Sequence, residues 1–529
     1  MLIENIRVPV HLTEEAVFAE ARKRIRACGM LGDPTRLEMH RKSIDARRRE
    51  VSFVCSVWAE VSAKTGVSEE ALQKFGIRFS ESKPLLLPLG EETMNGRPVI
   101  VGFGPAGIFC GLLLAECGFR PLILERGGSV DERILAVERF SGEGVLDTAT
   151  NIQFGAGGAG TFSDGKLTTR ISDSRCRYVL ERLHELGAPA DILWRAKPHI
   201  GTDILRDVIR RADERIRKLG GEIRYHAKAE RVSSASLFVG AEQIPFGALV
   251  LACGHSARDL YGELIAGGFA MEAKPFSVGV RVEHLQSDID SAMYGDYAGK
   301  YGLVHAEYAV SHRYGDRGAY SFCMCPGGEV VAAASEEGGV VTNGMSNRKR
   351  DGRNANSAIA VSVHTSDYGG TPMGAIEYQR NLERAAFRAG GSDYCAPCQT
   401  VGDFLQGKSG TEARRIRPTY RGGMVRYTDF HNILPPYVCS MLEMGFRQFG
   451  RKIRGFDAHD VPMTGVETRT SAPVRILRDD ASLTAPLYER IYPCGEGAGY
   501  AGGIMSAAVD GIRVAQAILA RYRRVGSDE

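Results

Sequence analysis

The sequence predicts an α/β protein in which a Rossmann-like, doubly wound parallel sheet is split by a long insertion. Three observations lead to this expectation. Strand and helix patterns alternate in a short N-terminal unit, an apolar strand then enters a glycine-rich turn and an apolar helix, and a second strand–glycine–helix pattern appears close to the C-terminus. The expected parts are a small ferredoxin-like α+β domain (1–90), the first part of the doubly wound domain (91–275), a β-rich α+β substrate domain (276–470) and the C-terminal part of the doubly wound domain (471–529).

Bulk composition restricts the class of protein. The chain has 529 residues, too many for one ordinary domain, and 43% of them are apolar. The 67 basic and 64 acidic residues leave a net charge of +3, which favours neither nucleic acid nor an anionic membrane as a partner. No apolar run approaches the roughly 18 residues of a membrane span, and the N-terminus lacks a basic start followed by an apolar block. We therefore expect a cytoplasmic protein that contacts no membrane, and the charge balance by itself gives no indication of a nucleic-acid partner.

The N-terminal unit follows a β-α-β-β order. Strands are expected at Ile6–His11, Arg36–Ala46 and Val51–Ala63, with a helix from the N-cap Thr13 to about Cys28. Basic residues are frequent on this helix and in the turn between the last two strands: Arg22, Lys23, Arg24, Arg26, and Arg47 to Arg49. Acidic residues lie among them, which is typical of a solvated surface, and contact with a protein or RNA is the alternative.

Residues 98–127 carry a β-α-β dinucleotide fingerprint. An apolar strand ends at Gly102, which allows a tight turn, while Gly104 allows close approach of a pyrophosphate and Gly107 lets the helix pack against the strand. The helix N-terminus presents free amides to phosphates. Glu125 ends the next strand, where a carboxylate can hold ribose hydroxyls and would repel a 2′-phosphate. The expected cofactor contacts in this segment also include Pro105, Ala106 and Arg126.

A second glycine-rich run, GAGGAGTFSDGKLTT at 155–169, is close to a nucleotide-triphosphate loop. The run fits G-x-x-x-x-G-K, but Leu167 stands where that loop needs a hydroxyl for magnesium, and Thr168 comes one residue late. We therefore expect no ATPase. The expected role is a loop that passes a bound dinucleotide and flavin, with contacts from Gly157, Gly158, Ser163 and Lys166.

Two later segments resemble the flavoproteins that share the glutathione-reductase FAD fold. An apolar strand ends at Cys253-Gly254, and Gly495-Glu496 precedes Gly502-Gly503-Ile504 at the start of a helix. The resemblance implies that the first segment returns the chain to FAD, that Glu496 lies on the ribitol, and that the helix N-terminus faces the flavin. Glutamate replaces the usual aspartate at this position, so its longer side chain must reach differently. Ala229, at the start of a predicted strand, completes the cofactor set.

A narrower resemblance rests on FGAGGAGTFSDGKLTTRI, AYSFCMCPGGEVVAA, VVTNGMS, ETRTSAPVRI and GEGAGYAGGIMSAAVDG. These segments look like a bacterial family described only as FAD-dependent dehydrogenases of unknown substrate. The resemblance covers essentially the whole chain. It implies non-covalently bound FAD and names no substrate.

These observations lead us to expect a FAD oxidoreductase that transfers two electrons to or from a small organic molecule. No second dinucleotide fingerprint is found, so hydride is expected from the substrate, from a transiently docked NAD(P)H or from a protein partner. The alternatives are a flavin-containing RNA-modifying or RNA-binding protein and a flavin monooxygenase. The C-x-x-C at Cys395 and Cys398 is either a redox pair or two reduced thiols, and no metal site is expected. The catalytic residue stays open among His199, His255, His312, Tyr308, Lys166, Arg281 and Arg469.

Overall fold

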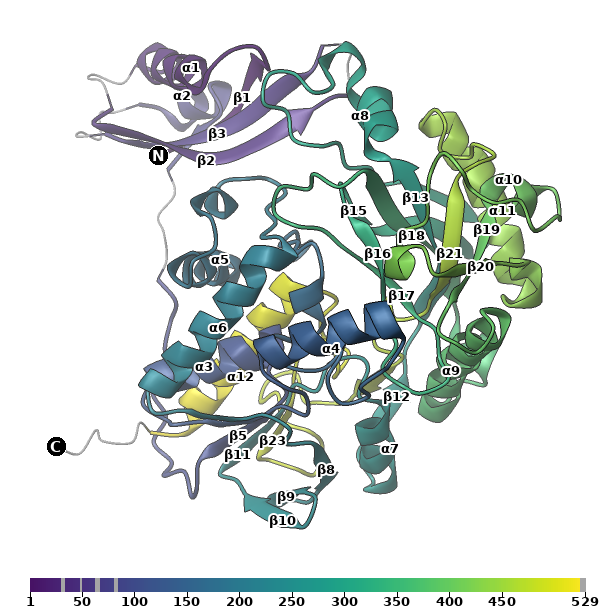
Figure 1. Ribbon diagram of the computed structural model, residues 1–529. Coiled ribbons are helices and arrows are strands. Elements are labelled where there is room, and N and C mark those ends of the chain that lie inside the picture. Colours follow the sequence, from purple (N-terminus) through teal and green to yellow (C-terminus); the bar gives the residue numbers. More distant parts are fainter. Residues whose placement is uncertain (30–33, 48–49, 62–66, 80–83, 524–529) are drawn as a thin grey trace.

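The N-terminal unit forms a four-stranded antiparallel sheet in the order β2-β3-β1-β4 (Figure 1). The computed structural model describes residues 1–29, 34–47, 50–61, 67–79 and 84–523. The elements of the unit are β1 (Leu2–Pro9), α1 (Glu14–Ala27), β2 (Arg36–Asp45), β3 (Ser52–Glu60), α2 (Glu69–Lys74) and β4 (Ile77–Arg78). The chain order β-α-β-β-α-β is that of split β-α-β units, with one helix and one strand more than the sequence pattern predicted. The end of the third predicted strand, at Ala63, lies outside the described residues.

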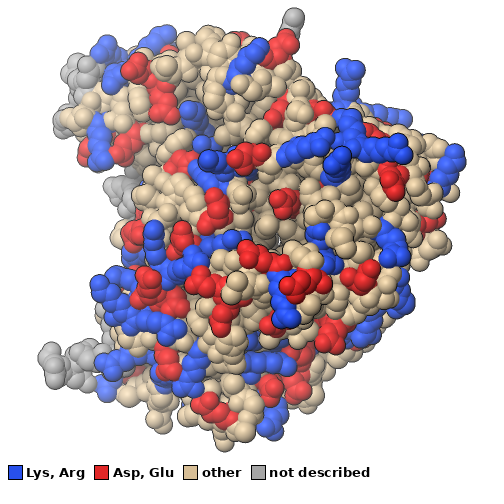
Figure 2. All heavy atoms as spheres, in the orientation of Figure 1, with Lys and Arg blue, Asp and Glu red and all other residues tan. Residues whose placement is uncertain are grey.

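Several of the described basic residues of this unit are paired within it. Arg24 bonds Glu20 and donates to the carbonyl of Glu4, and Arg47 forms an ion pair with Asp45. Two of the predicted basic turn residues, Arg48 and Arg49, lie outside the described part of the chain. Figure 2 shows acidic and basic side chains interspersed over the visible face of the molecule.

A five-stranded parallel sheet in the order β23-β11-β5-β6-β7 forms the second unit. Four of its strands are short and apolar, as expected of strands that are buried on both faces, whereas the edge strand β7 has the sequence Glu-Ile-Arg. The C-terminal strand β23 extends the sheet next to β11, so distant parts of the sequence meet in one layer. The strands are β5 (Pro98–Val101), β6 (Leu122–Leu124), β7 (Glu222–Arg224), β11 (Ala248–Leu251) and β23 (Ile491–Pro493).

The two faces of this sheet have different covers. Ile100 and Val250 pack with one group of helices, while their neighbours Val99 and Leu249 pack with a small antiparallel sheet and one helix. The doubly wound prediction, with helices on both faces, is too simple because strands replace most helices on the second face. The first cover contains α3 (Pro105–Glu116), α4 (Val130–Glu143), α5 (Arg175–Glu185), α6 (Thr202–Lys218) and α12 (Ile504–Arg521), and the second β8 (Ala229–Val232), β9 (Ser236–Val239), β10 (Glu242–Pro245) and α7 (Arg258–Ala266).

The inserted segment forms a seven-stranded mixed sheet in the order β14-β15-β18-β13-β21-β19-β20. Its core is separate from that of the parallel sheet and includes Val280, Val361 and Phe446. The strands are β13 (Phe276–Leu285), β14 (Ser311–Tyr314), β15 (Arg317–Cys325), β18 (Asn354–Val363), β19 (Ala396–Thr400), β20 (Val425–Tyr427) and β21 (Pro462–Glu467). Its helices are α8 (Gln286–Tyr294), α9 (Pro372–Ala389), α10 (Val401–Leu405) and α11 (Pro436–Lys452).

Two small strand pairs complete the arrangement. The pair β12 (Met271–Ala273) and β22 (Val474–Ile476) lies where the chain enters and leaves the inserted segment. The pair β16 (Glu329–Ala332) and β17 (Thr342–Met345) extends from the seven-stranded sheet toward the parallel sheet (Figure 1). None of the described helices has the length and apolar composition needed to cross a membrane.

Candidate functional site

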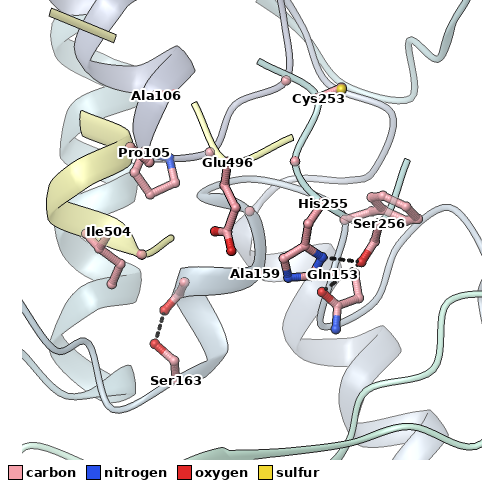
Figure 3. Close-up of a pocket in the computed structure, with 18 of the residues that line it drawn as sticks. Pro105, Ala106, Gln153, Ala159, Ser163, Cys253, His255, Ser256, Glu496 and Ile504 are labelled. Atoms are coloured by element: carbon pink, nitrogen blue, oxygen red, sulfur yellow. Dashed lines mark hydrogen bonds between the residues drawn. The ribbon is translucent and has the colours of Figure 1, made fainter. Parts of the chain in front are cut away.

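A cavity of about 350 Å³ lies where the parallel sheet meets the inserted domain. Its size is within the range of about 300–1,000 Å³ that is usual for small-molecule and cofactor sites. The N-termini of α3 and α12 both open onto it, as Figure 3 shows at Pro105 and Ile504. The glycine-rich run after α4 and the strand end at Gly254 form further walls.

Two glycines of the first fingerprint are required by backbone contacts. Gly102 has φ +101°, and a Cβ there would collide with the carbonyl of Ala252 on the neighbouring strand. A Cβ at Gly107 would collide with the carbonyl of Gly102, so the close approach of α3 to the turn depends on glycine. Gly104 differs, because a Cβ there would make ordinary contact with Gly158 at 3.7 Å. Its glycine therefore keeps space free in the cavity.

Glu125 ties the turns around this end of the cavity together. Its buried carboxylate accepts backbone hydrogen bonds from Phe103 at 2.9 Å, Gly127 at 3.0 Å and Gly155 at 2.9 Å. An ionised carboxylate offers about four acceptor positions, so these bonds leave room for about one more. The neighbouring Arg126 is held by two hydrogen bonds to Asp259 and lies over the ring of Phe154.

The glycine-rich run is shaped by Arg133 of α4. This fully buried guanidinium donates to the carbonyls of Asn151, Ile152, Ala156 and Gly158. Burial lowers the pKa of Arg133 to about 9. A short 3₁₀ turn, Gly158–Phe162, follows in place of the long helix that a triphosphate loop would open.

The two predicted polar contacts of this run have protein partners. Ser163 donates to the carbonyl of Gly160 at 2.7 Å and accepts from the amide of Gly165. Lys166 forms an ion pair with Asp164 at 2.9 Å and donates to the carbonyl of Met324 in the inserted domain. The lysine therefore joins the loop to the opposite wall of the cavity.

The second helix N-terminus exposes bare backbone beside a glutamate. No atom lies within 4 Å of the position that a Cβ would take at Gly502 or Gly503. Glu496 projects its carboxylate into the space between Ile504 and His255 (Figure 3). Burial raises the pKa of Glu496 to about 7, against the opposing charge of Lys274.

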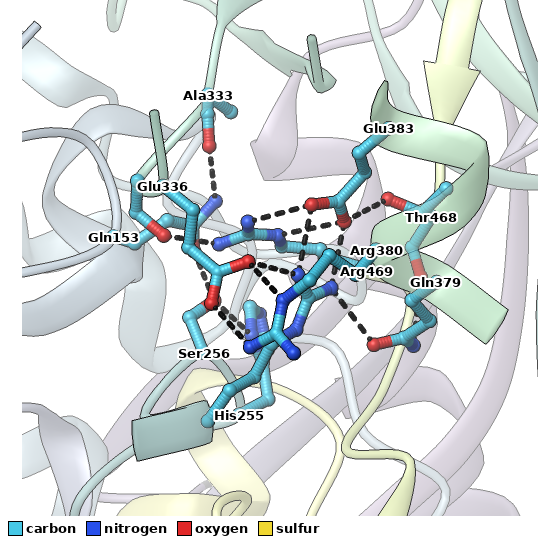
Figure 4. Close-up of polar contacts among 12 residues, drawn as sticks. Gln153, His255, Ser256, Ala333, Glu336, Gln379, Arg380, Glu383, Thr468 and Arg469 are labelled. Carbon is cyan, nitrogen blue, oxygen red and sulfur yellow. Dashed lines mark hydrogen bonds and ion pairs between the residues drawn. The ribbon is translucent and has the colours of Figure 1, made fainter. Parts of the chain in front are cut away.

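A buried ionic network supports the wall that the inserted domain contributes (Figure 4). Glu383 on α9 accepts two hydrogen bonds from Arg258 at 2.7 and 2.8 Å, and two from Arg469 at 3.0 and 3.2 Å. These arginines hold the pKa of the Glu383 carboxyl well below its usual range, despite burial. Because Arg258 begins α7 and Arg469 follows β21, the network fastens the two domains together at the cavity.

His255 contacts the cavity from the parallel-sheet side. Its Nδ1 lies 2.8 Å from the hydroxyl of Ser256, which in turn donates to Gln153 at 3.2 Å. Burial, together with the charges of Arg469 and Arg258, lowers the pKa of His255 to about 3. Its imidazole is therefore neutral near neutral pH.

Most residues predicted to contact the cofactor line this one cavity. They are Gly102, Gly104, Pro105, Ala106, Glu125, Arg126, Gly158, Ser163, Lys166, Ala229, Cys253, Gly254, Glu496, Gly502, Gly503 and Ile504. Gly107, Gly157 and Gly495 do not line it. A Cβ at Gly107 would collide with the Gly102 carbonyl, and at Gly157 and Gly495 with neighbouring side chains. Of the candidate catalytic residues, His255, Lys166 and Arg469 line the cavity, whereas His199, His312, Tyr308 and Arg281 do not.

Sequence reasoning missed the wall from the inserted domain. This wall contains Phe322, Cys323, Asn343, Glu467 and Thr470, and Gln153, Phe154, Asp164 and Ser256 lie elsewhere on the lining. Cys323 belongs to the Cys-Met-Cys pattern that is visible in the sequence, and this was the one local signal available. The candidate redox pair Cys395 and Cys398 lies away from the cavity, in and beside β19, and both cysteines are buried.

Two arginines of the inserted domain, Arg348 and Arg350, are engaged in internal contacts. Arg348 pairs with Asp191, and Arg350 forms ion pairs with Asp164 and Glu307.

Comparison with known proteins places the chain in a family. The chain belongs to the same family as an uncharacterized protein from Clostridium beijerinckii, with 45% identity over 502 residues that cover 93% of each chain. Residues 275–470 match the family model described as "FAD-dependent protein, C-terminal domain-like". This match supports a FAD-dependent enzyme. The placement among glutathione-reductase-type flavoproteins and the dehydrogenase reaction remain predictions.

Solved structures give weaker similarities. Halogenase PltM has 12% identity and a TM-score of 0.38, with coverage of 81% of this chain and 71% of that chain. Glycine oxidase from Geobacillus kaustophilus has 11% identity and a TM-score of 0.35, with coverage of 82% and 100%. At these values, neither the architecture nor the activity of those proteins is carried over to this chain.

Proposed function

We propose that this chain is an oxidoreductase that binds FAD non-covalently in the cavity and moves two electrons between FAD and a small organic substrate. The observation that carries the proposal is the convergence of two helix N-termini, from α3 and α12, on one cavity. Each helix has glycine at its N-cap, so its free amides are accessible. Such ends stabilise phosphate oxygens and other groups that carry or acquire negative charge.

The shape of the cavity fits a dinucleotide cofactor. The α carbons of Gly104 and Gly158 face each other across a narrow gap, since a Cβ at Gly158 would lie 3.0 Å from the Gly104 Cα. We assign the pyrophosphate to the α3 end of this glycine cradle and the adenosine ribose to the remaining acceptor position of Glu125. The isoalloxazine ring is assigned to the bare backbone of Gly502 and Gly503.

The bound flavin would supply the two-electron chemistry. Glu496 is assigned to the hydroxyl-rich ribityl chain between the two ends. Because its pKa is about 7, it can either donate to or accept from a hydroxyl near neutral pH. Neutral His255 offers a hydrogen-bonding group without adding a positive charge.

The substrate is expected to enter beside the inserted domain. Phe322, Asn343 and Thr470 give this wall an aromatic face, an amide and a hydroxyl. Two charged residues on the same wall are already paired, Glu467 with Arg281 and Arg469 with Glu383. The wall therefore favours a small molecule held by packing and neutral hydrogen bonds.

The first experiment asks whether the protein binds FAD and what reduces it. We expect a yellow protein as purified, or uptake of added FAD with a flavin absorbance band. NADH or NADPH is then added without oxygen, and bleaching identifies a reductase fed by that nucleotide. A flavin that stays oxidised identifies substrate or a protein as the electron donor. A colourless protein that takes up no FAD refutes the proposal.

A single substitution tests the assigned position. Gly104→Ala adds a methyl group that contacts Gly158 at an ordinary distance, and Gly104 has φ −86°, so the fold tolerates alanine. The methyl group occupies the space assigned to the pyrophosphate. We expect FAD affinity to fall about tenfold or more, which corresponds to about 1.4 kcal/mol. Gly142→Ala, on α4 with no atom near the added carbon, is the matched control and should bind FAD as the wild type does.

A further inference from the structure

The inserted domain brings a thiol into the cavity through an irregular strand. The pairing of β15 with β18 is interrupted between Phe322 and Cys325, and Cys323 lies in this interruption with φ +47°. Such bulges redirect side chains and are frequent beside active sites. Phe322 and Cys323 line the cavity, and Cys323 is half-buried whereas Cys325 is buried.

Two cations hold the Cys-Met-Cys backbone. Lys166 donates to the carbonyl of Met324, between the two cysteines. Arg281 donates to the carbonyl of Cys323 at 3.2 Å. The Cys325 thiol donates to the backbone carbonyl of Cys323 at 3.4 Å. The neighbouring Cys325 side chain, followed by the charges of Lys166 and Arg281, lowers the pKa of Cys323 despite burial. The ionised thiol is the nucleophilic form of cysteine.

Acidic groups around the pair are themselves neutralised. Glu467, which opposes ionisation of Cys323, forms a two-bonded ion pair with Arg281 at 2.8 and 3.0 Å. Asp164, on the other side, is paired with Arg350 and Lys166. Among the charged groups, Lys166 and Arg281 lower the pKa of Cys323 more than Glu467 raises it.

The other described cysteines of comparable exposure lack this environment. Cys253 also lines the cavity, but burial raises its pKa to about 12. Burial also raises the pKa of Cys176, on α5. In the C-x-x-C pattern, burial raises the pKa of Cys398 to about 12. Cys323 is thus distinguished by position, by its neighbour Cys325 and by its charged surroundings.

We propose that Cys323 and Cys325 form a redox-active dithiol that reduces a small disulfide substrate and is returned to the dithiol by the flavin. This inference rests on the proposed function and deepens it by naming the substrate class. The Cys323 thiolate attacks one sulfur of the substrate, the substrate S–S bond breaks, and one thiolate leaves. Cys325 loses its proton and attacks the Cys323 sulfur, which releases the second substrate thiolate and forms the Cys323–Cys325 disulfide. Bound flavin, itself reduced by a transiently docked hydride donor of the nicotinamide class, would supply the two electrons that restore both thiols, with the balancing protons taken from solvent.

Oxidised glutathione is a suitable small disulfide for the first test. The full-length protein is incubated with it, quenched in acid and analysed by mass spectrometry. Wild-type protein should lose two hydrogens without gaining glutathione, because Cys325 resolves the mixed disulfide. Cys325→Ser should accumulate one glutathione on Cys323, and Cys323→Ser should gain none at this site. Cys176→Ser is the matched control and should behave as the wild type does.

Alkylation of the unmodified protein gives a readout that needs no variant. Peptide mapping after brief exposure to iodoacetamide should show Cys323 modified at least about tenfold faster than Cys176, since thiolate content sets the rate. The dithiol proposal is overturned if Cys323 reacts no faster than Cys176, or if no internal disulfide forms with oxidised glutathione.

An anaerobic reductive titration tests the link to the flavin. Protein that was first treated with oxidised glutathione and then freed of it is titrated with dithionite. The wild type should take up twice as many reducing equivalents per flavin as Cys323→Ser does, because flavin and disulfide each accept two electrons. If the wild type and Cys323→Ser take up the same number of reducing equivalents per flavin, the electron transfer between flavin and dithiol is overturned. Failure of the protein to bind FAD refutes the proposed function separately, because the glutathione and alkylation measurements do not require flavin.

Discussion

The carboxyl group of Glu496 should make the stability of the FAD-free protein decrease with rising pH. Burial raises its pKa in the folded protein from 4.5 to about 7. Below about pH 4.5 the group is protonated in both the folded and unfolded states. Between that pH and about 7 the unfolded chain ionises first, so the free energy of unfolding falls by about 1.4 kcal/mol per pH unit. The total loss is about 3 kcal/mol, an upper limit because cavity water also solvates the carboxylate.

Glu496→Gln removes this ionisation while keeping a similar shape. The free energy of unfolding of the variant should exceed that of the wild type by about 1 kcal/mol at about pH 5 and by about 3 kcal/mol at about pH 8.5. Urea unfolding of the FAD-free proteins at both pH values measures the difference. Glu337→Gln, at an exposed position of the inserted domain, is the control and should show no such trend. Equal gains for Glu496→Gln at both pH values would refute the reasoning, since they would mean that the carboxyl is not desolvated.

Three further substitutions test how the cavity is built. Glu383→Gln should lower the free energy of unfolding by about 3–5 kcal/mol in urea, because two buried guanidinium groups lose their counter-charge. Gly107→Ala should lower the free energy of unfolding, measured in urea, by about 1–3 kcal/mol and should weaken FAD binding, because its methyl group pushes α3 away from Gly102. Arg133→Met should lower the free energy of unfolding by about 3 kcal/mol or more in thermal or urea unfolding, because several buried carbonyls lose their hydrogen-bond donor.

Each of these substitutions has a milder counterpart. Glu337→Gln removes an exposed carboxylate, and Gly142→Ala adds a methyl group in open space on α4. Arg139→Met removes an exposed arginine whose ion pair with Glu143 is worth about 0–1 kcal/mol. If a test variant and its counterpart lose the same free energy of unfolding, the assigned contacts are contradicted.

The part of the site that is continuous in sequence could be anticipated. Gly102, Gly107 and Glu125 belong to one strand–helix–strand unit, whose spacing is fixed by local backbone geometry. The two C-terminal glycines at 502 and 503 carry a similar local signal at a helix start. These residues were placed without knowledge of any tertiary contact.

The wall from the inserted domain could not be anticipated in the same way. Cys323 faces the cavity because β15 is interrupted opposite β18, and no local pattern fixes that register. In the sequence, Glu383 looks like an ordinary charged residue on an amphipathic helix. Its partners Arg258 and Arg469 belong to distant segments that only the tertiary fold brings next to it. Arg133 likewise resembles a surface arginine of α4, although its partners are carbonyls of the following loop.

The order of the strands in the parallel sheet has a consequence for biosynthesis. β23 and α12 are translated after the whole inserted domain, yet β23 pairs with β11 and α12 packs against α3. A nascent chain that has emerged only as far as β21 therefore has one of the two helix ends missing and an open sheet edge next to β11. Under the proposed function, cofactor capture would therefore follow release of the last helix from the ribosome, and until then the unpaired edge is a place where chaperones would be expected to act.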